Sequence, residues 1–524
     1  MNRTTLLSAA VSVTLVGTVL LSEPSIAEAK GKAKHVVVLV WDGMRRDFIS
    51  PQYTPHLYSL ATNGVFFKNH HPVYVSSTEV NGTAIATGCH PERSGIIGNQ
   101  DYRPEISLLG PMATEGVEQV RRGDMMTEGN YLLVPTVAEM LQQDGIVTVT
   151  AGTKPVVFLH DRDKRKTSEA GTNSALLYSG KTIPRSVEAA CVKANDDKPF
   201  PAAATPNSPR DNWTTKAMLN GLWRKNVPKY SLLWLSEPDA TQHADGVGHT
   251  NALAAIENSD RLLGEILKKL EENKVKDKTD ILVVSDHGFS TILKGQDVVE
   301  VLKKAKIRAA RKHEDPEKGD VLVVGLGGSS CFYVYEHDET VIRTLVEFLQ
   351  TTDFAGVIFS RLRIEGTFPL EAVRLNPTNV APDVVVSFRW FADRNDNGAP
   401  GLLISDGGTK GKGTHASLCR YDMLNTAVAW GPDFKQGHVS DVPSGNIDVT
   451  PTVLHILGVK PKAPLDGRVL TEALVGGSPA PTVETKTLEA SREVGIFRWT
   501  QYLKYSTVGH AVYYDEGNGA AAWK

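Results

Sequence analysis

The sequence predicts an α/β fold in which a central, mostly parallel sheet is flanked by helices. Three largely apolar runs stand at 36–40, 231–235 and 281–284, a pattern typical of parallel strands that are buried on both faces. Segments with helical periodicity, 55–63 and 251–270, are interleaved with these runs. Each of the three runs is followed by side chains able to bind a metal, which places a candidate site at the carboxyl edge of the sheet.

The chain of 524 residues is long enough for one large domain with insertions, or for two domains. Its N-terminus has the features of a secretory signal peptide: Arg3, an apolar stretch over 6–21, and the small residues Ala27 and Ala29 at cleavage-site spacing. An uncleaved membrane anchor is the alternative. We therefore predict a signal peptide at 1–29, a main α/β domain at 30–475, and a C-terminal extension at 476–524 that packs on the core.

Further strands and one further helix are expected along the main domain. The further strand candidates are 147–150, 321–324, 332–335, 357–360, 384–388 and 427–430. A helix is expected over 448–457, because Asp448 and Pro451 suit its start and Gly458 suits its end.

Two polar stretches, 100–129 and 161–210, are too long for ordinary connections. We expect them to be insertions that shape a substrate cleft. Near the C-terminus, the Gly/Ser/Pro-rich segment 476–481 resembles a linker, and the aromatic segment 497–514 is expected to add strands against the core.

Charge and hydropathy narrow the range of partners. With 57 Lys and Arg against 60 Asp and Glu, the net charge of -3 gives no reason to expect a nucleic-acid polymer or an anionic membrane as partner. No segment after the signal peptide reaches the roughly 18 consecutive apolar residues of a membrane helix. The processed protein is therefore expected to be secreted or periplasmic without a stable membrane span, and the sequence carries no signal of oligomeric state.

The cysteines show no CxxC spacing, which argues against a cysteine-ligated zinc site or a thioredoxin-like redox motif. They are Cys89, Cys191, Cys331 and Cys419. One or two disulfides and four free buried thiols are the two alternatives, and we assign no pairing.

Carboxylates and histidines follow the three central strands. Asp42 follows the first run, Asp239 and His243 the second, and Asp286 and His287 the third. A spacing of four residues allows Asp239 and His243 to converge on one metal from a single helical turn. Such a pair by itself is more often a surface ion pair, but its place after a buried strand favours a metal site.

A hydroxyl-bearing segment supplies a candidate nucleophile. Thr78, with Ser76 and Ser77 as fallback candidates, precedes a predicted helix that ends near Gly88. A hydroxyl at a helix N-terminus is well placed to attack phosphorus, because free backbone N–H groups and the helix dipole favour an anion there. Helix capping is the more common role of such residues. Because a threonine hydroxyl is a weak nucleophile unless a metal lowers its pKa, the nucleophile and metal hypotheses depend on each other.

The motifs, taken in order, resemble those of one protein family. They are Asp42-Gly43, Thr78 with Asn81, Pro91-Glu92-Arg93-Ser94-Gly95-Ile96, Glu237-Pro238-Asp239, His243, Ser285-Asp286-His287-Gly288 and Gly413-Thr414-His415. Over residues 36–470 the chain resembles the alkaline phosphatase superfamily, specifically its type I phosphodiesterase/nucleotide pyrophosphatase branch. The resemblance implies an alkaline phosphatase-like catalytic domain with inserted loops.

The resemblance also implies two metal ions, Zn²⁺ in the first place, with Mn²⁺ or Fe as alternatives that His and Asp ligands also accept. One ion would be held by Asp239, His243 and His415, and the other by Asp42, Asp286, His287 and Thr78. Thr78 would be the nucleophile, and the side-chain amide of Asn81 would contact a phosphoryl oxygen.

The implied activity is hydrolysis of a small-molecule phosphate ester, a phosphodiester or nucleotide pyrophosphate, through a covalent phosphothreonine. Lys154 lies about where monoester- or phosphonate-specific members carry a lysine that binds the phosphoryl group. If Lys154 reaches the site, its charge favours a phosphomonoesterase (alkaline phosphatase) or a phosphonate hydrolase. The alternative is that Lys154 is an ordinary surface lysine. A secreted, metal-dependent protein that binds a phosphorylated ligand without hydrolysing it is the non-enzymatic alternative.

At two places the sequence differs from the motifs of related enzymes, and both differences bear on the expected substrate. The segment 76–80 lacks the proline and arginine of a sulfatase motif, so hydrolysis of sulfate esters is not expected. Glu79, Val80 and Gly82 stand where many nucleotide pyrophosphatases carry an aromatic residue, a proline and a histidine. The sequence therefore does not support a pocket that stacks a nucleotide base at this position.

A further metal is suggested by the loop 393–398. Asp393, Asn395 and Asn397 alternate ahead of Gly398 like the oxygen ligands that open a calcium loop. Position twelve of such a loop would be Ile404 instead of the required Glu, and a plain polar turn is the alternative.

Overall fold

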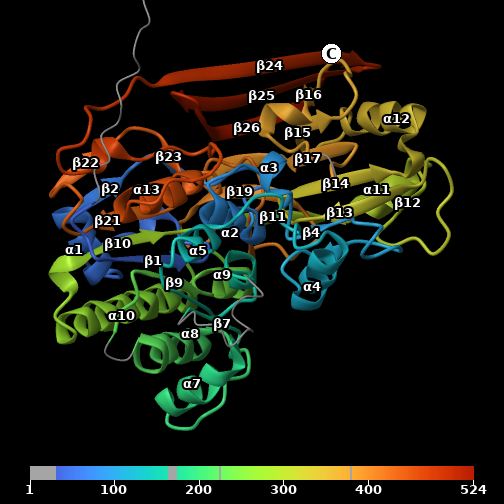
Figure 1. Ribbon diagram of the computed structural model, residues 1–524. Coiled ribbons are helices and arrows are strands. Elements are labelled where there is room, and N and C mark those ends of the chain that lie inside the picture. Colours follow the sequence, from blue (N-terminus) through green and yellow to red (C-terminus); the bar gives the residue numbers. More distant parts are fainter. Residues whose placement is uncertain (1–30, 163–173, 224–225, 378–379) are drawn as a thin grey trace, which may run out of the picture.

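The computed structural model describes residues 31–162, 174–223, 226–377 and 380–524. The predicted signal peptide lies outside these residues. In Figure 1 the central sheet and its helices lie on one side, a second sheet lies beside them, and three long C-terminal strands run along the edge of the molecule.

Nine strands form the central sheet, and the predicted α/β fold is confirmed. In spatial order they are β22 (His438–Ser440), β2 (Val65–Phe67), β21 (Ala427–Trp430), β10 (Thr279–Val284), β1 (His35–Trp41), β9 (Tyr230–Leu235), β6 (Thr148–Gly152), β7 (Ala175–Tyr178) and β8 (Lys181–Ile183). All except β21 and β8 run in the same direction. The three strands predicted ahead of the metal-binding residues are β1, β9 and β10, which are direct neighbours at the centre.

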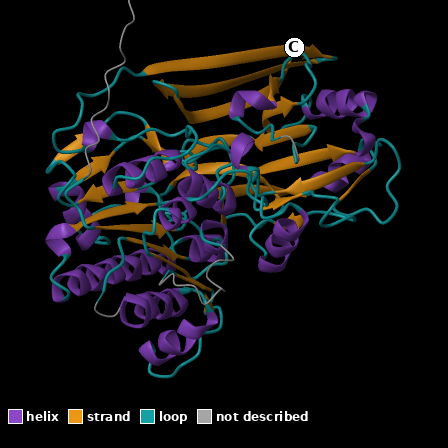
Figure 2. Cartoon of the chain, in the orientation of Figure 1, coloured by secondary structure: helices purple, strands orange, loops and turns teal. Residues whose placement is uncertain are grey.

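Both faces of the central sheet are covered, which explains the largely apolar runs. Val36 and Val38 of β1 point into one core cluster, and Val37 and Leu39 point into the other. One face packs against α2 (Thr78–Thr87), α5 (Val137–Gln143), α6 (Val157–His160) and α13 (Val449–Leu457). The other packs against α1 (Pro55–Asn63), α8 (Ser208–Lys216) and α10 (Thr250–Glu272), as Figure 2 shows. The helices predicted over 55–63, 251–270 and 448–457 are thus present.

The two long polar stretches contain regular structure. The first holds a hairpin of β4 (Gln100–Asp101) and β5 (Met112–Ala113), followed by α4 (Val117–Met126). The second supplies β7 and β8 to the central sheet, followed by α7 (Glu188–Ala194) and the first residues of α8. The second stretch is therefore not a simple insertion, because its short apolar run Ala175–Tyr178 is fully buried beside β6.

A second, six-stranded sheet contains four strands that the sequence had suggested without placing them. Its order is β12 (Ala309–Ala310), β13 (Val321–Gly325), β14 (Ser329–Val334), β17 (Val384–Phe388), β15 (Ala355–Ser360) and β16 (Phe368–Pro369). Helices α11 (Val298–Lys304) and α12 (Glu339–Leu349) pack on one face. A four-stranded sheet of β18 (Trp390–Arg394), β19 (Pro400–Asp406), β11 (Ser290–Gln296) and β20 (Gly413–Thr414) leads the chain back to the carboxyl edge of the central sheet.

The C-terminal residues form a separate antiparallel sheet of β24 (Glu484–Val494), β25 (Phe497–Val508) and β26 (Ala511–Trp523). It packs on the second sheet through Leu503 and Tyr514. The side chain of Gln501 also bonds both backbone groups of Ile358 in β15, at 2.8 and 3.2 Å. Strands thus form over the aromatic segment, and β24 adds one that the sequence did not indicate.

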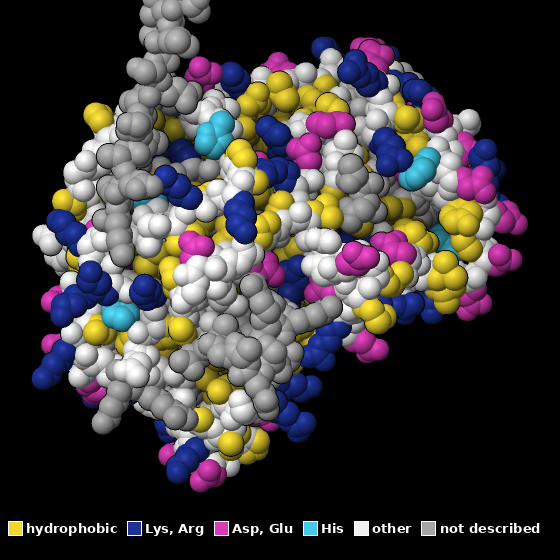
Figure 3. Space-filling view, in the orientation of Figure 1, with side chains coloured by type: hydrophobic (Ala, Val, Ile, Leu, Met, Phe, Trp, Pro, Cys, Tyr) yellow, Lys and Arg dark blue, Asp and Glu magenta, His cyan; other side chains and the backbone are white. Residues whose placement is uncertain are grey.

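All four cysteines are buried and free, so the alternative with four thiols describes this fold and the disulfide alternative does not. Within the described residues, no helix is both long enough and apolar enough to cross a bilayer. On the face shown in Figure 3, basic and acidic side chains are interspersed, in line with the near balance of the two charges in the sequence.

A buried carboxyl pair joins β10 to the first described residues. Asp433 accepts hydrogen bonds from the backbone N–H groups of Lys32 and Ala33, at 2.6 and 2.9 Å, and its own N–H donates to Asp280 at 3.2 Å. Burial, reinforced by the neighbouring Asp433, raises the pKa of Asp280 from 3.8 to about 8. Asp280 therefore keeps its proton in the native state at pH values where the unfolded chain has lost it.

This pair predicts a pH-dependent stability. Between pH 4 and about 8 the native state binds one more proton at Asp280 than the unfolded state, so stability falls as pH rises. The slope is at most about 1.4 kcal/mol per pH unit. Asp280→Asn removes this titration, so we expect the variant to melt close to the wild type at pH 4 and clearly above it at pH 8.5. Thermal unfolding of both proteins, with Asp277→Asn as exposed control, checks this; parallel pH curves would contradict it.

Candidate active site

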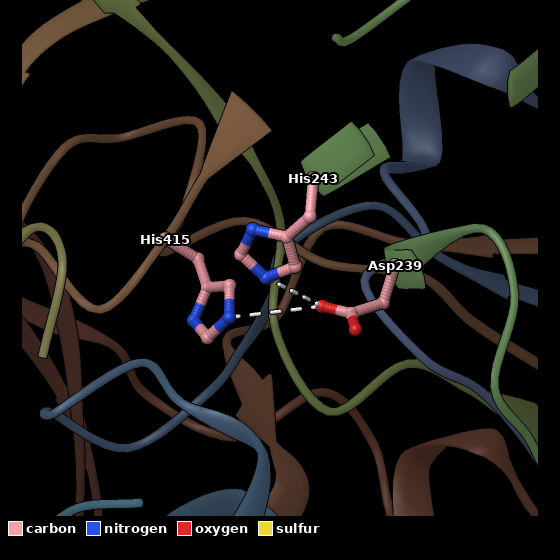
Figure 4. Close-up of side chains that lie close together, drawn as sticks. All are labelled: Asp239, His243 and His415. Atoms are coloured by element: carbon pink, nitrogen blue, oxygen red, sulfur yellow. Dashed lines mark ion pairs between the residues drawn. The ribbon is translucent and has the colours of Figure 1, made fainter. Parts of the chain in front are cut away.

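The first metal-binding group combines two residues of one helix with one from a distant loop. Asp239 and His243 lie in α9 (Asp239–Asp245), which follows β9, and His415 follows β20. The Nε2 atoms of His243 and His415 lie 3.3 and 3.6 Å from Oδ1 of Asp239. Figure 4 shows both rings turned toward this carboxylate. The side chain of His243 is 41% exposed whereas those of Asp239 and His415 are buried, so the group opens to solvent on the His243 side.

The second group lies deeper and consists of Asp42, Asp286 and His287, all fully buried. Asp42 follows β1, and the other two follow β10. Nε2 of His287 lies 3.2 Å from Oδ2 of Asp286 and 3.7 Å from Oδ1 of Asp42. Because β9, β1 and β10 are parallel neighbours, their carboxyl ends bring both groups to one edge of the sheet.

The three histidines are each oriented by a backbone carbonyl. Nδ1 of His243, His287 and His415 lies 2.8 to 3.0 Å from a carbonyl oxygen of Gly413, Gly288 and Ser76, respectively. A carbonyl can only accept a hydrogen bond, so Nδ1 carries the proton and the lone pair of Nε2 faces the carboxylates. This is the usual outer-shell arrangement of metal-binding histidines.

The carboxylates also fit a pair of cations. Oδ1 of Asp42, Oδ1 of Asp239 and Oδ2 of Asp286 are buried and have no hydrogen-bond partner. Burial raises the pKa of Asp42, and the carboxylates of Asp239 and Asp286 raise it further. Burial likewise raises the pKa of Asp286 to about 7. Three carboxyl groups that cannot reach water repel one another when ionised, and divalent cations would offset this cost.

Thr78 is the first residue of α2, and its hydroxyl faces the second group. Oγ1 of Thr78 lies 3.3 Å from Nε2 of His287, and the residue is 1% exposed. Ser77 holds the N-cap position without a side-chain cap, and the hydroxyl of Ser76 donates to the carbonyl of Ser417 at 2.7 Å. Thr78 therefore has a position suited to attack and is not a helix cap.

Residues 36–389 match the model of the family described as type I phosphodiesterase/nucleotide pyrophosphatase. The chain belongs to this family. Its members are phosphoric ester hydrolases, and the resemblance predicted from the motifs is thereby confirmed.

Relatives of this phosphodiesterase-family protein are distant in sequence. Bis(5'-adenosyl)-triphosphatase enpp4 of Mus musculus is 20% identical over 445 residues, which cover 82% of this chain and 78% of the relative. Venom phosphodiesterase CdcPDE of Crotalus durissus collilineatus is 22% identical over 259 residues, 49% of this chain and 26% of that enzyme. The structure of murine ectonucleotide pyrophosphatase/phosphodiesterase 5 in complex with AMP superposes with a TM-score of 0.58 at 16% identity, over 84% of this chain and 100% of that one, and shows the shared fold.

In this family member Lys154 reaches the metal-binding residues and does not lie on the open surface. Its Nζ lies 2.9 Å from Oδ2 of Asp42 and 3.1 Å from Oδ2 of Asp239, and its side chain is 23% exposed. The indole N–H of Trp234 donates to the same oxygen of Asp42 at 2.8 Å. Burial works against the ionisation of Lys154, but the carboxylates of Asp239 and Asp42 more than compensate and raise its pKa well above 10.5.

Asn81 has a different role from the one predicted. Its Oδ1 accepts from the N–H of Val73 at 2.7 Å, and its Nδ2 lies 3.2 Å from the carbonyls of Val73, Val75 and Ser77. The residue is fully buried. Since each polar atom is already used within the protein, Asn81 holds the chain that enters α2 and is not available to a phosphoryl oxygen.

Asn99 is better placed for that contact, and sequence reasoning missed it. Its Oδ1 accepts from the backbone N–H of Glu79 at 3.3 Å, next to Thr78. Unlike Asn81, it is partly exposed. Asn99 follows the Pro91–Ile96 motif by a few residues, but no spacing rule within one sequence connects it to Thr78; the connection appears once α2 and the loop after α3 (Pro91–Ser94) are folded together.

The loop 393–398 forms a turn that uses its own oxygen atoms. Asp393 lies within β18, and Oδ1 of Asn395 accepts from the N–H groups of Asn397 and Ala399 at 3.0 and 2.9 Å. The Nδ2 of Asn397 donates to the carbonyl of Val247. This is an Asx-type turn, so the polar-turn alternative describes the loop and we do not assign calcium to it.

Proposed function

We propose that the protein is an extracytoplasmic di-zinc hydrolase of phosphate esters, of the phosphodiesterase/nucleotide pyrophosphatase type, that uses Thr78 as a covalent nucleophile. The observation that carries this proposal is the position of the Thr78 hydroxyl, 3.3 Å from Nε2 of His287 in the buried metal-binding group of Asp42, Asp286 and His287. The predicted signal peptide and the secreted venom phosphodiesterase among its relatives support the location.

In the proposed reaction six residues hold the metals and Thr78 attacks the substrate. Asp42, Asp286 and His287 would hold one metal beside Thr78, and Asp239, His243 and His415 would hold the other. Bound zinc ions supply Lewis acidity, which lowers the pKa of a hydroxyl and offsets charge on phosphoryl oxygens. Oγ1 of Thr78 attacks phosphorus, its proton leaves to solvent, and the bond from phosphorus to the ester oxygen breaks. Water then attacks the phosphothreonine, and the Thr78 oxygen leaves and regains a proton.

Two side chains at the rim would bind the phosphoryl group. Asn99, fixed to the N–H of Glu79, can present its amide N–H groups beside Thr78. Lys154 brings a positive charge to Asp42 and Asp239, one from each metal-binding group. That charge favours a doubly charged phosphoryl group, so phosphate monoesters or phosphonates form the second candidate substrate class.

Metal analysis and a substrate panel test the proposal. We expect about two zinc ions per chain and turnover of bis-aryl phosphate, aryl monophosphate or a nucleotide. Mn²⁺ or Fe in place of zinc would change the metal and leave the site assignment intact. Bound metal without turnover of any of these esters would overturn the enzymatic proposal and support a phospho-ligand binding protein instead.

Lys154→Met tests the role of the lysine. If Lys154 binds the phosphoryl group, kcat/KM for aryl monophosphate should fall by about tenfold or more, because a charge-assisted hydrogen bond is lost. The bis-aryl diester, which carries one charge less, should lose clearly less. Lys181→Met, at an exposed position of β8, is the control. An equal loss for both substrates would show that Lys154 does not distinguish the charge of the phosphoryl group.

A further inference from the structure

Each of the three metal-binding carboxylates uses one oxygen to accept from a protein donor and leaves the other oxygen free. Oδ1 of Asp286 accepts from a backbone N–H at 2.9 Å, and Oδ2 of Asp239 accepts from Nζ of Lys154 at 3.1 Å. Oδ2 of Asp42 has two donors, the indole N–H of Trp234 at 2.8 Å and Nζ of Lys154 at 2.9 Å. The remaining oxygen of each carboxylate is buried without a hydrogen-bond partner. These donors therefore determine which oxygen is available to a metal.

The two donors on Asp42 differ in how firmly they are committed to it. Lys154 is a long, partly exposed side chain whose ammonium group also contacts Asp239 and, in the proposed function, the phosphoryl group of the substrate. Trp234 is fully buried, and an indole has a single N–H donor, which here points at Asp42. Trp234 is therefore the donor that can hold Asp42 whatever Lys154 contacts.

The indole is fixed by its strand and by the helix that begins with the nucleophile. Trp234 lies in β9, opposite Val40 of β1 on one side and Gly152 of β6 on the other. Its carbonyl accepts from the backbone N–H of Thr153 at 3.1 Å. A Cβ atom added to Gly82 of α2 would lie 3.2 Å from Cη2 of the indole, so glycine at this position lets the helix pack closely on the ring. The indole N–H is thus held in one direction by packing on both sides.

We propose that Trp234 is a positioning residue: its indole N–H fixes the carboxylate of Asp42 with Oδ1 toward the second metal-binding group, Asp42 with Asp286 and His287. Outer-shell donors of this kind orient metal ligands and strengthen metal binding. The inference rests on the metal binding in the proposed function and extends it to a residue outside both groups. It also gives the two donors separate roles, because Lys154 can turn to a phosphoryl group while Trp234 keeps Asp42 in place.

The test measures zinc affinity after the indole N–H is removed. Trp234→Phe keeps an aromatic ring without a donor, and a His415→Ala background weakens the first group so that calorimetric titration with zinc reports on the second. In this background we expect Trp234→Phe to raise the zinc Kd about tenfold or more. Trp223→Phe is the matched control, because Trp223 is also buried but donates to Ser231, at 2.9 Å, and belongs to neither group. It should leave the zinc Kd within about twofold.

Two further measurements separate positioning from a general structural role. Replacement of Trp234 by 3-benzothienylalanine puts sulfur in place of the N–H and keeps the shape of the ring, so the variant should fold like the wild type and still show the raised zinc Kd. In a double-mutant cycle, Trp234→Phe should raise the zinc Kd at least about threefold more in a Lys154→Met background than with Lys154 present, because Oδ2 of Asp42 then has neither donor. Excess zinc should restore the turnover that Trp234→Phe loses.

The outcomes are distinguishable from failure of the proposed function. If both replacements of Trp234 leave the zinc Kd at the control value, or if the lost turnover does not return in excess zinc, the positioning role is wrong while the hydrolase assignment stands. Equal effects with and without Lys154 would overturn the separate roles of the two donors. If the wild type binds zinc but hydrolyses no phosphate ester, the hydrolase assignment fails, and the titrations still decide the role of Trp234. A wild type that binds no zinc would overturn both.

Discussion

Thr78→Ala is expected to lower turnover of the best phosphate ester by at least about 1000-fold while both metals stay bound. Thr78 provides the attacking oxygen in the proposed reaction, and removing a covalent nucleophile leaves the residual catalysis of the surrounding charges. The metal-binding groups consist of other side chains, so zinc content should not change by more than the error of metal analysis. Steady-state kinetics with aryl phosphates, together with metal analysis of the same samples, measures both quantities.

Two further variants test whether the loss of turnover in Thr78→Ala is due to the missing hydroxyl of Thr78. Thr78→Ser retains a hydroxyl at the same position and should keep a substantial part of the activity. Ser77→Ala removes a neighbouring buried hydroxyl that makes no hydrogen bond and should remain close to wild type in rate. Brief incubation of the wild type with substrate, acid quench and peptide mass spectrometry should place a phosphoryl group on Thr78. Turnover within tenfold of wild type in Thr78→Ala would show that another group attacks phosphorus.

The central sheet could be predicted because its strands obey one simple constraint. β1, β9 and β10 are covered by helices on both faces, so most of their side chains are apolar and lack the polar alternation of a half-exposed strand. Their carboxyl ends therefore lie at one edge of the sheet, so the sequence alone predicts that Asp42, Asp239 and Asp286 lie close together.

The partition into two sheets could not be predicted in this way. β13, β14, β15 and β17 are as thoroughly buried as the central strands, and their apolar runs look the same in the sequence. Which sheet a strand joins depends on pairing between distant segments. The same limit applies to β7, whose four apolar residues sit inside a long polar stretch and are recognisable as a strand once β6 lies beside them.

The candidate site likewise contains residues that the sequence pattern reveals and residues that it does not. The Asp and His residues at strand ends could be found from local pattern, whereas His415 required a family resemblance because it lies in a loop between β20 and β21 without any distinctive pattern. For Asn81 and Asn99, proximity in the sequence to Thr78 was misleading. Asn81 lies one helical turn from Thr78 in sequence but points into the interior, and Asn99 is distant in sequence but bonded to the neighbour of Thr78. Side-chain direction, which spacing alone did not reveal, separates the two.

His415→Ala should lower the zinc content from about two ions to about one per chain and reduce turnover by more than about 100-fold. Loss of an outer-shell partner of a metal ligand already costs 10- to 100-fold in affinity or activity, and loss of a direct ligand should cost more. His415 is also stacked on His287, with ring centroids 3.8 Å apart, so its removal opens a gap next to the second group as well.

His438→Ala is the control for this experiment, since His438 lies in β22 at the far edge of the sheet and belongs to neither metal-binding group. Metal analysis after dialysis and calorimetric titration with zinc should show one tight site lost in His415→Ala and none lost in the control. Addition of zinc in excess should restore part of the turnover, because Asp239 and His243 remain as ligands. If His415→Ala keeps two tight zinc ions and wild-type turnover, the loop that carries His415 does not complete the site, and the pairing of α9 with β20 would be a structural contact alone.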